Sequence, residues 1–158
     1  MADPRDPDMK RRLNEELKLR EGFRPFAPSV PLEDADRFFD LPVASPYMLL
    51  TAPVRAGVGL PAVTHADGSA RVQTVDAEDS PRYHALLRAM GEATGVPVLL
   101  NTSFNVRGEP IVRTAAEAYR CFMRTGMTAL VIESWLFRRS EQSPWVEPGD
   151  WRAELLQD

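Results

Sequence analysis

The sequence predicts an α/β (α+β) fold in a single domain, on three observations. Residues 96–100 are continuously apolar, which is typical of a short buried strand. Residues 80–94 and 114–126 each combine a helix start signal with an apolar face. Fourteen prolines in 158 residues favour long ordered loops over a helical bundle. A chain of this length can form one domain around one hydrophobic core.

The N-terminal part predicts two short helical segments separated by a proline-rich stretch. Residues 8–18 predict a helix capped by Asp8, because apolar residues recur along one stripe. The prolines within residues 20–28 argue against a regular helix or a central strand there. Residues 33–39 predict one or two helical turns.

The middle of the chain predicts a strand followed by a hairpin. Residues 46–54 contain an apolar run and predict the strand. The dipeptide Asp67-Gly68 lies between two β-prone runs, residues 61–65 and 70–75. Because such a dipeptide is a strong turn signal, we expect those two runs to pair.

The C-terminal part predicts two capped helices and two strands. Pro81 suits the first position of a helix that Gly95 ends. Thr114 and Glu117 have capping-box spacing at the start of the next helix. The strands are predicted at residues 129–132 and 135–137. We expect residues 1–139 to form the domain and residues 140–158 to form a tail or docking segment.

Composition excludes several classes of function. The net charge of −4 provides no whole-surface attraction to nucleic acid or to an anionic membrane, so neither is expected as a partner. The single cysteine, Cys121, excludes an internal disulfide and a cysteine-based zinc site, and its place on a predicted helix favours a packing role. No apolar run approaches the roughly 18 residues that cross a bilayer. The charged N-terminus lacks a signal-peptide core, so the cytoplasm is the expected location.

A polar cluster directly follows the predicted buried strand. Its side chains cannot all be satisfied in a core, so we expect them at the carboxyl end of the strand, where open α/β sheets bind ligands. Hydroxyls, amides and a glycine backbone suit a phosphate or a carbonyl group. The alternative is a loop whose polar side chains only hold its turns together. The candidates are Asn101, Thr102, Ser103, Asn105 and Arg107.

Two further sets of residues are candidates for anion binding. Lys18, Arg20 and Arg24 lie among aromatic residues and prolines, with Glu21 to neutralise them. Prolines restrict the loop, so these cations could be held in place for a polyphosphate; the alternative is a solvated basic turn. The hairpin region adds Thr64, His65 and Arg71, and Arg55 follows the strand predicted before it. A lone histidine is more often a structural hydrogen-bonding residue, and these arginines are open to a purely surface role.

Several known signatures are absent from the sequence. It contains no Walker-type glycine loop, no Gly-x-Gly-x-x-Gly and no Gly-x-Ser-x-Gly. The two histidines lack metal-ligand spacing, so no metal site is expected within this chain.

Six longer motifs follow one another along residues 2–139. They are Ala2-Asp-Pro-Arg5, Leu17-Lys-Leu-Arg-Glu-Gly-Phe-Arg-Pro-Phe-Ala-Pro-Ser29, Ser45-Pro-Tyr-Met48, Pro61-Ala-Val-Thr-His65 with Asp67-Gly-Ser-Ala-Arg-Val-Gln73, Gly95-Val-Pro-Val-Leu-Leu-Asn-Thr-Ser-Phe-Asn105, and Gly108-Glu-Pro-Ile-Val112. Together they resemble the C-terminal domain of the O-carbamoyltransferases of nodulation-factor and antibiotic biosynthesis, the NodU/CmcH type. The resemblance implies a YrdC-like fold, a twisted mixed sheet with surrounding helices and a concave nucleotide site.

The resemblance also implies an activity and roles for the candidate residues. ATP, as a substrate, and carbamoyl phosphate would give carbamoyl-adenylate and pyrophosphate, with Mg²⁺ left open as a companion ion. Lys18 and Arg24 would neutralise phosphate charge. Arg71, with Arg55, would hold the carbamoyl donor. Ser103 and Asn105 would bind phosphate and carbamoyl oxygens while Thr102 or Asn101 orients the loop. The expected binding set is completed by Arg20, Thr64, His65 and Arg107.

Members of this family also carry a large N-terminal domain, similar to sugar-kinase-like ATPases, which transfers the carbamoyl group to a hydroxyl acceptor. This sequence has no counterpart of that domain. A separately encoded subunit with a kinase-like partner chain, a truncated chain and a degenerate remnant are the open explanations. The alternative to an enzyme is a non-catalytic nucleotide-binding or regulatory module that is a remnant of such an enzyme.

Overall fold

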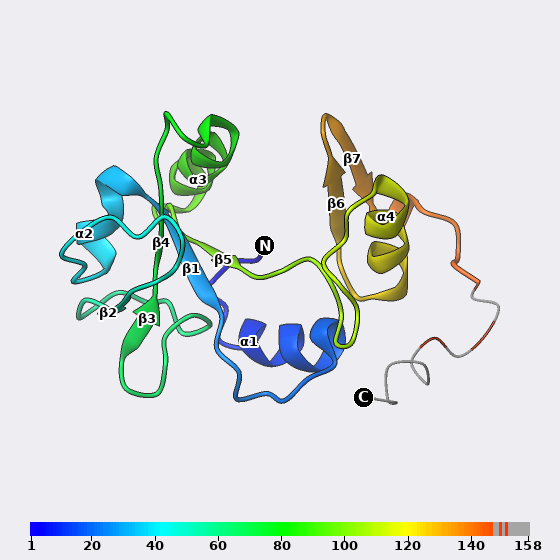
Figure 1. Cartoon of the computed structure of the whole chain (residues 1–158), viewed down its shortest axis with the longest axis horizontal. Coiled ribbons are helices and arrows are strands. Elements are labelled where there is room, and N and C mark those ends of the chain that lie inside the picture. Colours follow the sequence, from blue (N-terminus) through cyan, green and yellow to red (C-terminus); the bar gives the residue numbers. More distant parts are fainter. Residues whose placement is uncertain (147–148, 150, 152–158) are drawn as a thin grey trace. The chain divides into compact units, whose positions relative to one another are not determined.

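The computed structural model describes residues 1–146, 149 and 151, and it confirms the α/β (α+β) class (Figure 1). The chain divides into two compact units, which we call unit 1 (residues 1–10 and 23–102) and unit 2 (residues 11–22 and 103–158). The elements are α1 (Met9–Arg12), the π-helical η1 (Leu13–Lys18), β1 (Ala27–Pro31), the 3₁₀ turn η2 (Leu32–Asp34), α2 (Ala35–Phe38), β2 (Thr51–Pro53), β3 (Ser69–Arg71), β4 (Gln73–Val75), α3 (Pro81–Thr94), β5 (Leu99–Asn101), α4 (Ala115–Arg124), β6 (Ala129–Ile132), β7 (Trp135–Arg138) and the 3₁₀ turn η3 (Arg139–Glu141).

Unit 1 is built around a mixed three-stranded sheet in the order β4-β1-β5. The central strand β1 runs parallel to β4 and antiparallel to β5. Helix α3 packs on this sheet, where its buried Leu87 meets Val75 of β4 and Leu99 of β5. The predicted helix at residues 80–94 is confirmed, with Pro81 at its start and Gly95 in the left-handed conformation (φ 79°) at its end. The predicted buried strand is also confirmed, shifted toward Asn101.

The prediction that residues 20–28 avoid a central strand is wrong for the last two residues. Ala27 and Pro28 open β1, which lies in the middle of the sheet. Opposite Pro28 is Leu100, whose N–H and C=O both bond to Ala2 (2.9 and 3.1 Å) on its other side. Pro28 therefore occupies a non-hydrogen-bonded position of the antiparallel pair, where its missing N–H removes no hydrogen bond to β5.

The strand and hairpin predicted at residues 46–75 need correction. Of the strand predicted at residues 46–54, only Thr51–Pro53 forms, because Met48 has a positive φ of 57° and its neighbours Tyr47 and Leu49 are exposed. The strand β3 pairs with β2, whereas residues 61–63 form turns. The predicted turn at Asp67-Gly68 is confirmed: Gly68 has φ 80° and donates its N–H to the His65 carbonyl at 3.0 Å.

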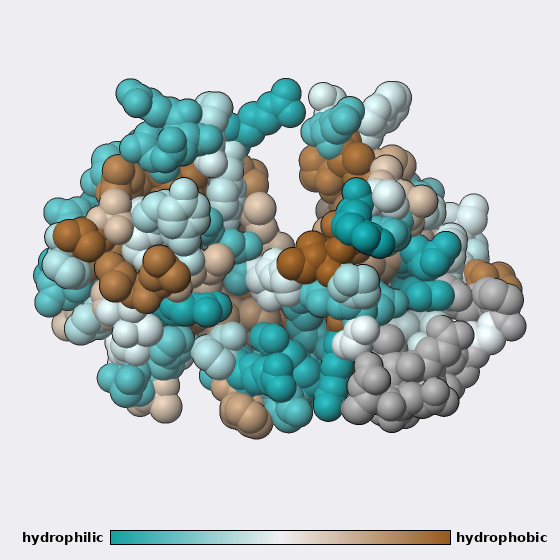
Figure 2. Space-filling view, in the orientation of Figure 1, coloured by the Kyte–Doolittle hydropathy of each residue, from teal (hydrophilic) through white to brown (hydrophobic). Residues whose placement is uncertain are grey.

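Unit 2 contains helix α4, the hairpin β6–β7 and the part of the predicted 8–18 helix that begins at Arg11. The predicted helix forms as α1 followed by η1, which ends at Lys18; Leu19 follows it in the left-handed conformation (φ 51°). Both strands and the Thr114–Glu117 capping box of α4 are confirmed. The core of α4 and β6 comprises Ala118, Phe122, Met123 and Leu130. Figure 2 shows apolar side chains over the β6–β7 hairpin, where Val131 and Leu136 are exposed.

The predicted tail at residues 140–158 lies partly outside the described residues, which omit 147, 148, 150 and 152–158. Its described part begins within η3, and Trp145 packs edge-on against Tyr119 of α4, with ring centroids 6.1 Å apart. The domain boundary at residue 139 stays a prediction. Within the described chain, every helix is too short or too polar to cross a bilayer.

Candidate anion-binding site

The side chain of Lys18 is buried at the end of η1, where it binds the polar loop that follows Thr102. Its ammonium group donates to Ser103 Oγ at 3.1 Å and to the backbone oxygen and Oδ1 of Asn105, both at 3.0 Å. It also bonds the backbone oxygen of Ser103. Only 6% of Lys18 is exposed. Four oxygen atoms therefore surround a group that has three protons to donate.

All four of these oxygen atoms are neutral, so none cancels the charge of the ammonium group. Burial lowers the pKa of Lys18 to about 8, and the nearby charge of Arg20 acts in the same direction. Most Lys18 side chains still carry a proton at pH 7. A buried cation without a carboxylate among its hydrogen-bond partners is electrostatically costly, and an arriving anion would reduce that cost.

Hydrogen bonds within residues 103–109 hold this loop in place against Lys18. Ser103 Oγ donates to Asn105 Oδ1 at 2.6 Å, and Asn105 Nδ2 donates to the Glu109 carbonyl at 2.8 Å. The backbone N–H of Arg107 donates to the Lys18 carbonyl at 3.2 Å. The loop therefore contacts both the side chain and the backbone of Lys18. Gly108 has φ 76°, a conformation that suits glycine at this turn.

Asn14 is a buried residue of this site that sequence reasoning missed. Its side chain is fully buried; Oδ1 accepts from Arg20 Nε at 2.8 Å and Nδ2 donates to the Gly22 carbonyl at 3.2 Å. Asn14 thus fixes Arg20 and the turn that follows η1. The one available signal was a polar residue beside the apolar stripe of the helix. Arg107 lies near Glu21, with 3.6 Å between Nη1 and Oε1.

In unit 1, Asn101 belongs to a row of polar side chains that crosses the three strands. Gln73 of β4 accepts from Ser29 of β1 at 2.6 Å and from Asn101 Nδ2 of β5 at 2.7 Å. Its own amide donates to the Pro46 carbonyl at 3.2 Å. Gln73 therefore sets the orientation of the Asn101 carboxamide. Neither Gln73 nor Ser29 was a predicted site residue, because Gln73 lies in a predicted strand and Ser29 directly follows the proline-rich stretch, without a local signal for a site.

The other predicted site residues of unit 1 have local contacts or are exposed. Thr64 donates to the Leu60 carbonyl at 2.8 Å, and Nδ1 of His65 lies 3.1 Å from Ser69 Oγ. Arg55 bonds the Asp36 carbonyl and lies 3.4 Å from Asp40. Exposed or half-buried positions are occupied by Arg24, which precedes β1, Arg71, which ends β3, and Thr102, which follows β5.

The structure therefore gathers only some of the predicted residues. Those in unit 2 are Lys18, Arg20, Ser103, Asn105 and Arg107, and those in unit 1 are Arg24, Arg55, Thr64, His65, Arg71, Asn101 and Thr102. Of these, Lys18, Ser103 and Asn105 are directly bonded to one another. No group of three or more His, Cys, Asp or Glu side chains within the described residues is placed to hold a metal ion.

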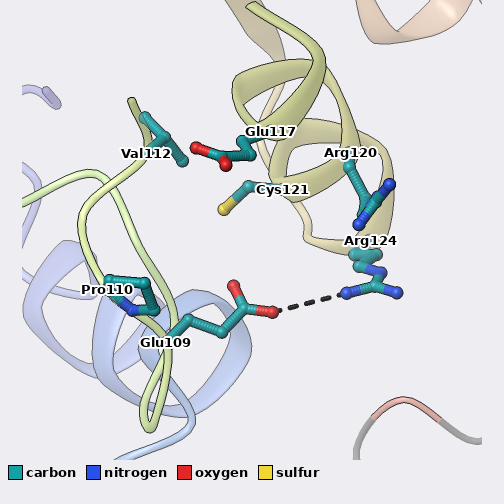
Figure 3. Close-up of a pocket in the computed structure, with 7 residues that line it drawn as sticks. All are labelled: Glu109, Pro110, Val112, Glu117, Arg120, Cys121 and Arg124. Atoms are coloured by element: carbon teal, nitrogen blue, oxygen red, sulfur yellow. Dashed lines mark hydrogen bonds and ion pairs between the residues drawn. The ribbon is translucent and has the colours of Figure 1, made fainter. Parts of the chain in front are cut away.

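A cavity of about 180 Å³ lies between the end of this loop and α4 (Figure 3). Glu109 of the loop faces Arg124 of α4, with Oε1 and Nη1 3.3 Å apart. Cys121 also lines the cavity, and burial raises the pKa of its thiol to about 11. Such a thiol is a poor nucleophile at neutral pH, and its burial agrees with the predicted packing role. Sequence reasoning singled out neither Glu109 nor Arg124.

Comparison with known proteins gives a family match over most of the chain. Residues 1–139 match the family described as carbamoyltransferase C-terminus. The chain is 46% identical to the nodulation protein NolNO of Sinorhizobium fredii over 91% of its own length and 22% of that protein. It is 43% identical to the protein sll1178 of Synechocystis over its whole length and 29% of that protein. It is 40% identical to the 3'-hydroxymethylcephem-O-carbamoyltransferase of Amycolatopsis lactamdurans over 89% of its length and 27% of that enzyme. The chain thus spans about a quarter of the length of these relatives.

Proposed function

Because the chain belongs to the carbamoyltransferase C-terminus family, we propose that it converts carbamoyl phosphate and ATP into carbamoyl-adenylate. The name of the Amycolatopsis relative supports the carbamoyl group as the unit that is handled. The buried ammonium group of Lys18, surrounded by neutral oxygens, supports an anionic ligand and is the observation that carries the proposal.

The proposed reaction balances when one water molecule is consumed. Water cleaves carbamoyl phosphate to carbamate and inorganic phosphate. An oxygen of the carbamate then attacks the α-phosphorus of ATP, and the bond from that phosphorus to the pyrophosphate oxygen breaks. The products are carbamoyl-adenylate, pyrophosphate and phosphate. Mg²⁺ would arrive with ATP and offset part of the phosphate charge.

In this reaction Lys18 would stabilise negative charge that increases as the phosphorus is attacked. A fixed cation in a site that excludes water acts more strongly on such charge than a solvated one. Ser103 and Asn105 would supply a hydroxyl and an amide once the anion takes over part of the Lys18 hydrogen bonding. The roles of Arg24 and Arg71 in binding the two substrates are further parts of the proposal.

Lys18→Met tests this function directly. We expect the wild-type chain to exchange labelled pyrophosphate into ATP only when carbamoyl phosphate is present. Lys18→Met should lower the exchange rate by about 100-fold, since one lost charge-stabilising group costs about that much. Lys10→Met, which removes the other lysine of the chain, is the matched control and should leave the rate unchanged.

A folded wild-type protein without exchange would contradict the proposed activity. Calorimetric binding of ATP by that same protein would then favour the non-catalytic nucleotide-binding module. An equal loss of rate in both lysine variants would contradict the assignment of Lys18.

Transfer of the carbamoyl group to a hydroxyl acceptor is proposed for a different domain. The relatives contain about three quarters of their length beyond the part matched here, which offers a place for such a domain. We propose a kinase-like partner of this kind and a cytoplasmic setting, where ATP is abundant.

A further inference from the structure

Glu109 is held at two points, and each point connects to a different part of the site. Its backbone carbonyl accepts the Asn105 Nδ2 proton at 2.8 Å. Its carboxylate pairs with Arg124 on α4 at 3.3 Å, where both side chains are largely buried (29% and 15% exposed). The guanidinium of Arg124 also lies over the ring of Trp151, 5.3 Å from its centroid. Glu109 is therefore the link between helix α4 and the loop that meets Lys18.

This link determines which way the Asn105 side chain faces. Because Asn105 Nδ2 donates to the Glu109 carbonyl, its Oδ1 must point toward Lys18 and Ser103. If the carbonyl moved away, the carboxamide could rotate and present its NH₂ group to the ammonium, which is repulsive. A partly buried ion pair to a helix resists such movement better than a solvated one.

We propose that Glu109 and Arg124 are positioning residues that hold the 103–109 loop in the conformation that buries the Lys18 ammonium group. The pair acts on Lys18 through Asn105. The expected effect of this pair on catalysis rests on the proposed function. Its effect on the environment of Lys18 does not, because that concerns only how the ammonium group is held.

The titration of Lys18 can be followed directly by NMR, since Lys10 and Lys18 are the only lysines of the chain. Protein labelled with ¹³C-lysine gives two Cε signals, which Lys10→Arg assigns. Their pH titration reports the environment of each amine in the full chain. Lys10 serves as the internal reference in every variant.

The key variant is Glu109→Met, because its two possible effects on the pKa of Lys18 have opposite signs. Loss of a negative charge by itself disfavours the ammonium form and lowers the pKa of Lys18. Release of the loop exposes the amine to water and raises its pKa toward the ordinary lysine value of about 10.4. We expect a rise of about one unit or more in Glu109→Met, with the Lys10 signal unchanged.

Glu141→Met is the matched control, since it breaks the exposed Arg138–Glu141 pair at 3.8 Å in the same unit. It should leave the titration of Lys18 as in the wild type. An unchanged or lowered pKa of Lys18 in a folded Glu109→Met protein would overturn the proposal. Should Glu109→Met fail to fold, Glu109→Gln keeps an acceptor for Arg124, and a smaller rise is expected; a fall there would also overturn it.

Pyrophosphate exchange then tests whether the Glu109–Arg124 pair affects the proposed reaction. Arg124→Met should lower the exchange rate about tenfold, chiefly in kcat, since a misplaced loop loses interactions made in the transition state. Arg124→Lys, which keeps the charge opposite Glu109, should restore part of the rate. An unchanged kcat in Arg124→Met would overturn the positioning role. Wild-type protein without exchange would refute the proposed function and leave the lysine titration to decide the inference about Glu109.

Discussion

At the scale of single residues, the sequence predicted chemistry better than contacts. Lys18, Ser103 and Asn105 were chosen for their functional groups, and the structure brings the three together across more than 80 positions. Their mutual bonds depend on where the chain returns, which local patterns do not encode. Asn14 and Glu109 were missed because no local pattern marks their partners: Asn14 bonds Arg20 and Gly22 beyond the end of its helix, and Glu109 pairs with Arg124 of α4.

The ammonium group of Lys18 predicts a pH dependence of stability. Its pKa is about 8 in the folded chain and higher when unfolded, so folding releases a proton between pH 8 and about 10.4. Raising the pH through this window should therefore stabilise the wild type relative to Lys18→Met. Urea unfolding of both proteins at several pH values from 7 to 10 measures the difference. A difference that stays constant over this range would show that Lys18 titrates normally in the folded protein.

At the scale of elements, helix ends were predicted well and strand partners poorly. Pro81, Gly95 and the Thr114–Glu117 box act through neighbouring backbone groups, so a short stretch of sequence contains their whole effect. The strand β3 instead pairs with β2, and Pro28 sits in a central strand because Leu100 bonds elsewhere. Both outcomes depend on segments that are remote in the chain.

The capping box of α4 gives a prediction at this scale. Thr114 Oγ1 accepts from the Glu117 N–H, and the Glu117 carboxylate accepts from the Thr114 N–H, both at 3.2 Å. Thr114→Ala should lower the free energy of unfolding by about 1 kcal/mol, because one cap bond is lost. Thr114→Ser keeps the hydroxyl and should stay within about 0.5 kcal/mol of the wild type. Equal stability of the Ala and Ser variants in chemical denaturation would contradict the role of this cap.

At the scale of the whole molecule, the α/β class followed from the sequence patterns, and the family resemblance implied the mixed character of the main sheet. The family match agrees with the resemblance carried by its long motifs. The division into two compact units was not predicted, because each unit draws on residues from separate stretches of the chain. The YrdC-like arrangement and the domain boundary at residue 139 stay predictions.

Ligand binding by the whole chain can be measured as thermal stabilisation. A ligand at 100 times its Kd adds about 2.7 kcal/mol to the stability of the folded state, which corresponds to several degrees in Tm. We expect ATP with Mg²⁺ to raise the Tm of the wild type by several degrees and to raise the Tm of Lys18→Met by less. A wild-type Tm unmoved by millimolar ATP and by carbamoyl phosphate would favour a remnant that binds neither.

The path of the chain between the units limits how the protein can be dissected. The backbone passes from one unit to the other after residues 10, 22 and 102, so no single cut separates the two. A gene fragment that begins at Ser103 encodes the hydroxyl and amide of the site but not its amine. Isolation of unit 2 would require the peptide of residues 11–22 to be joined to that fragment or added to it in trans.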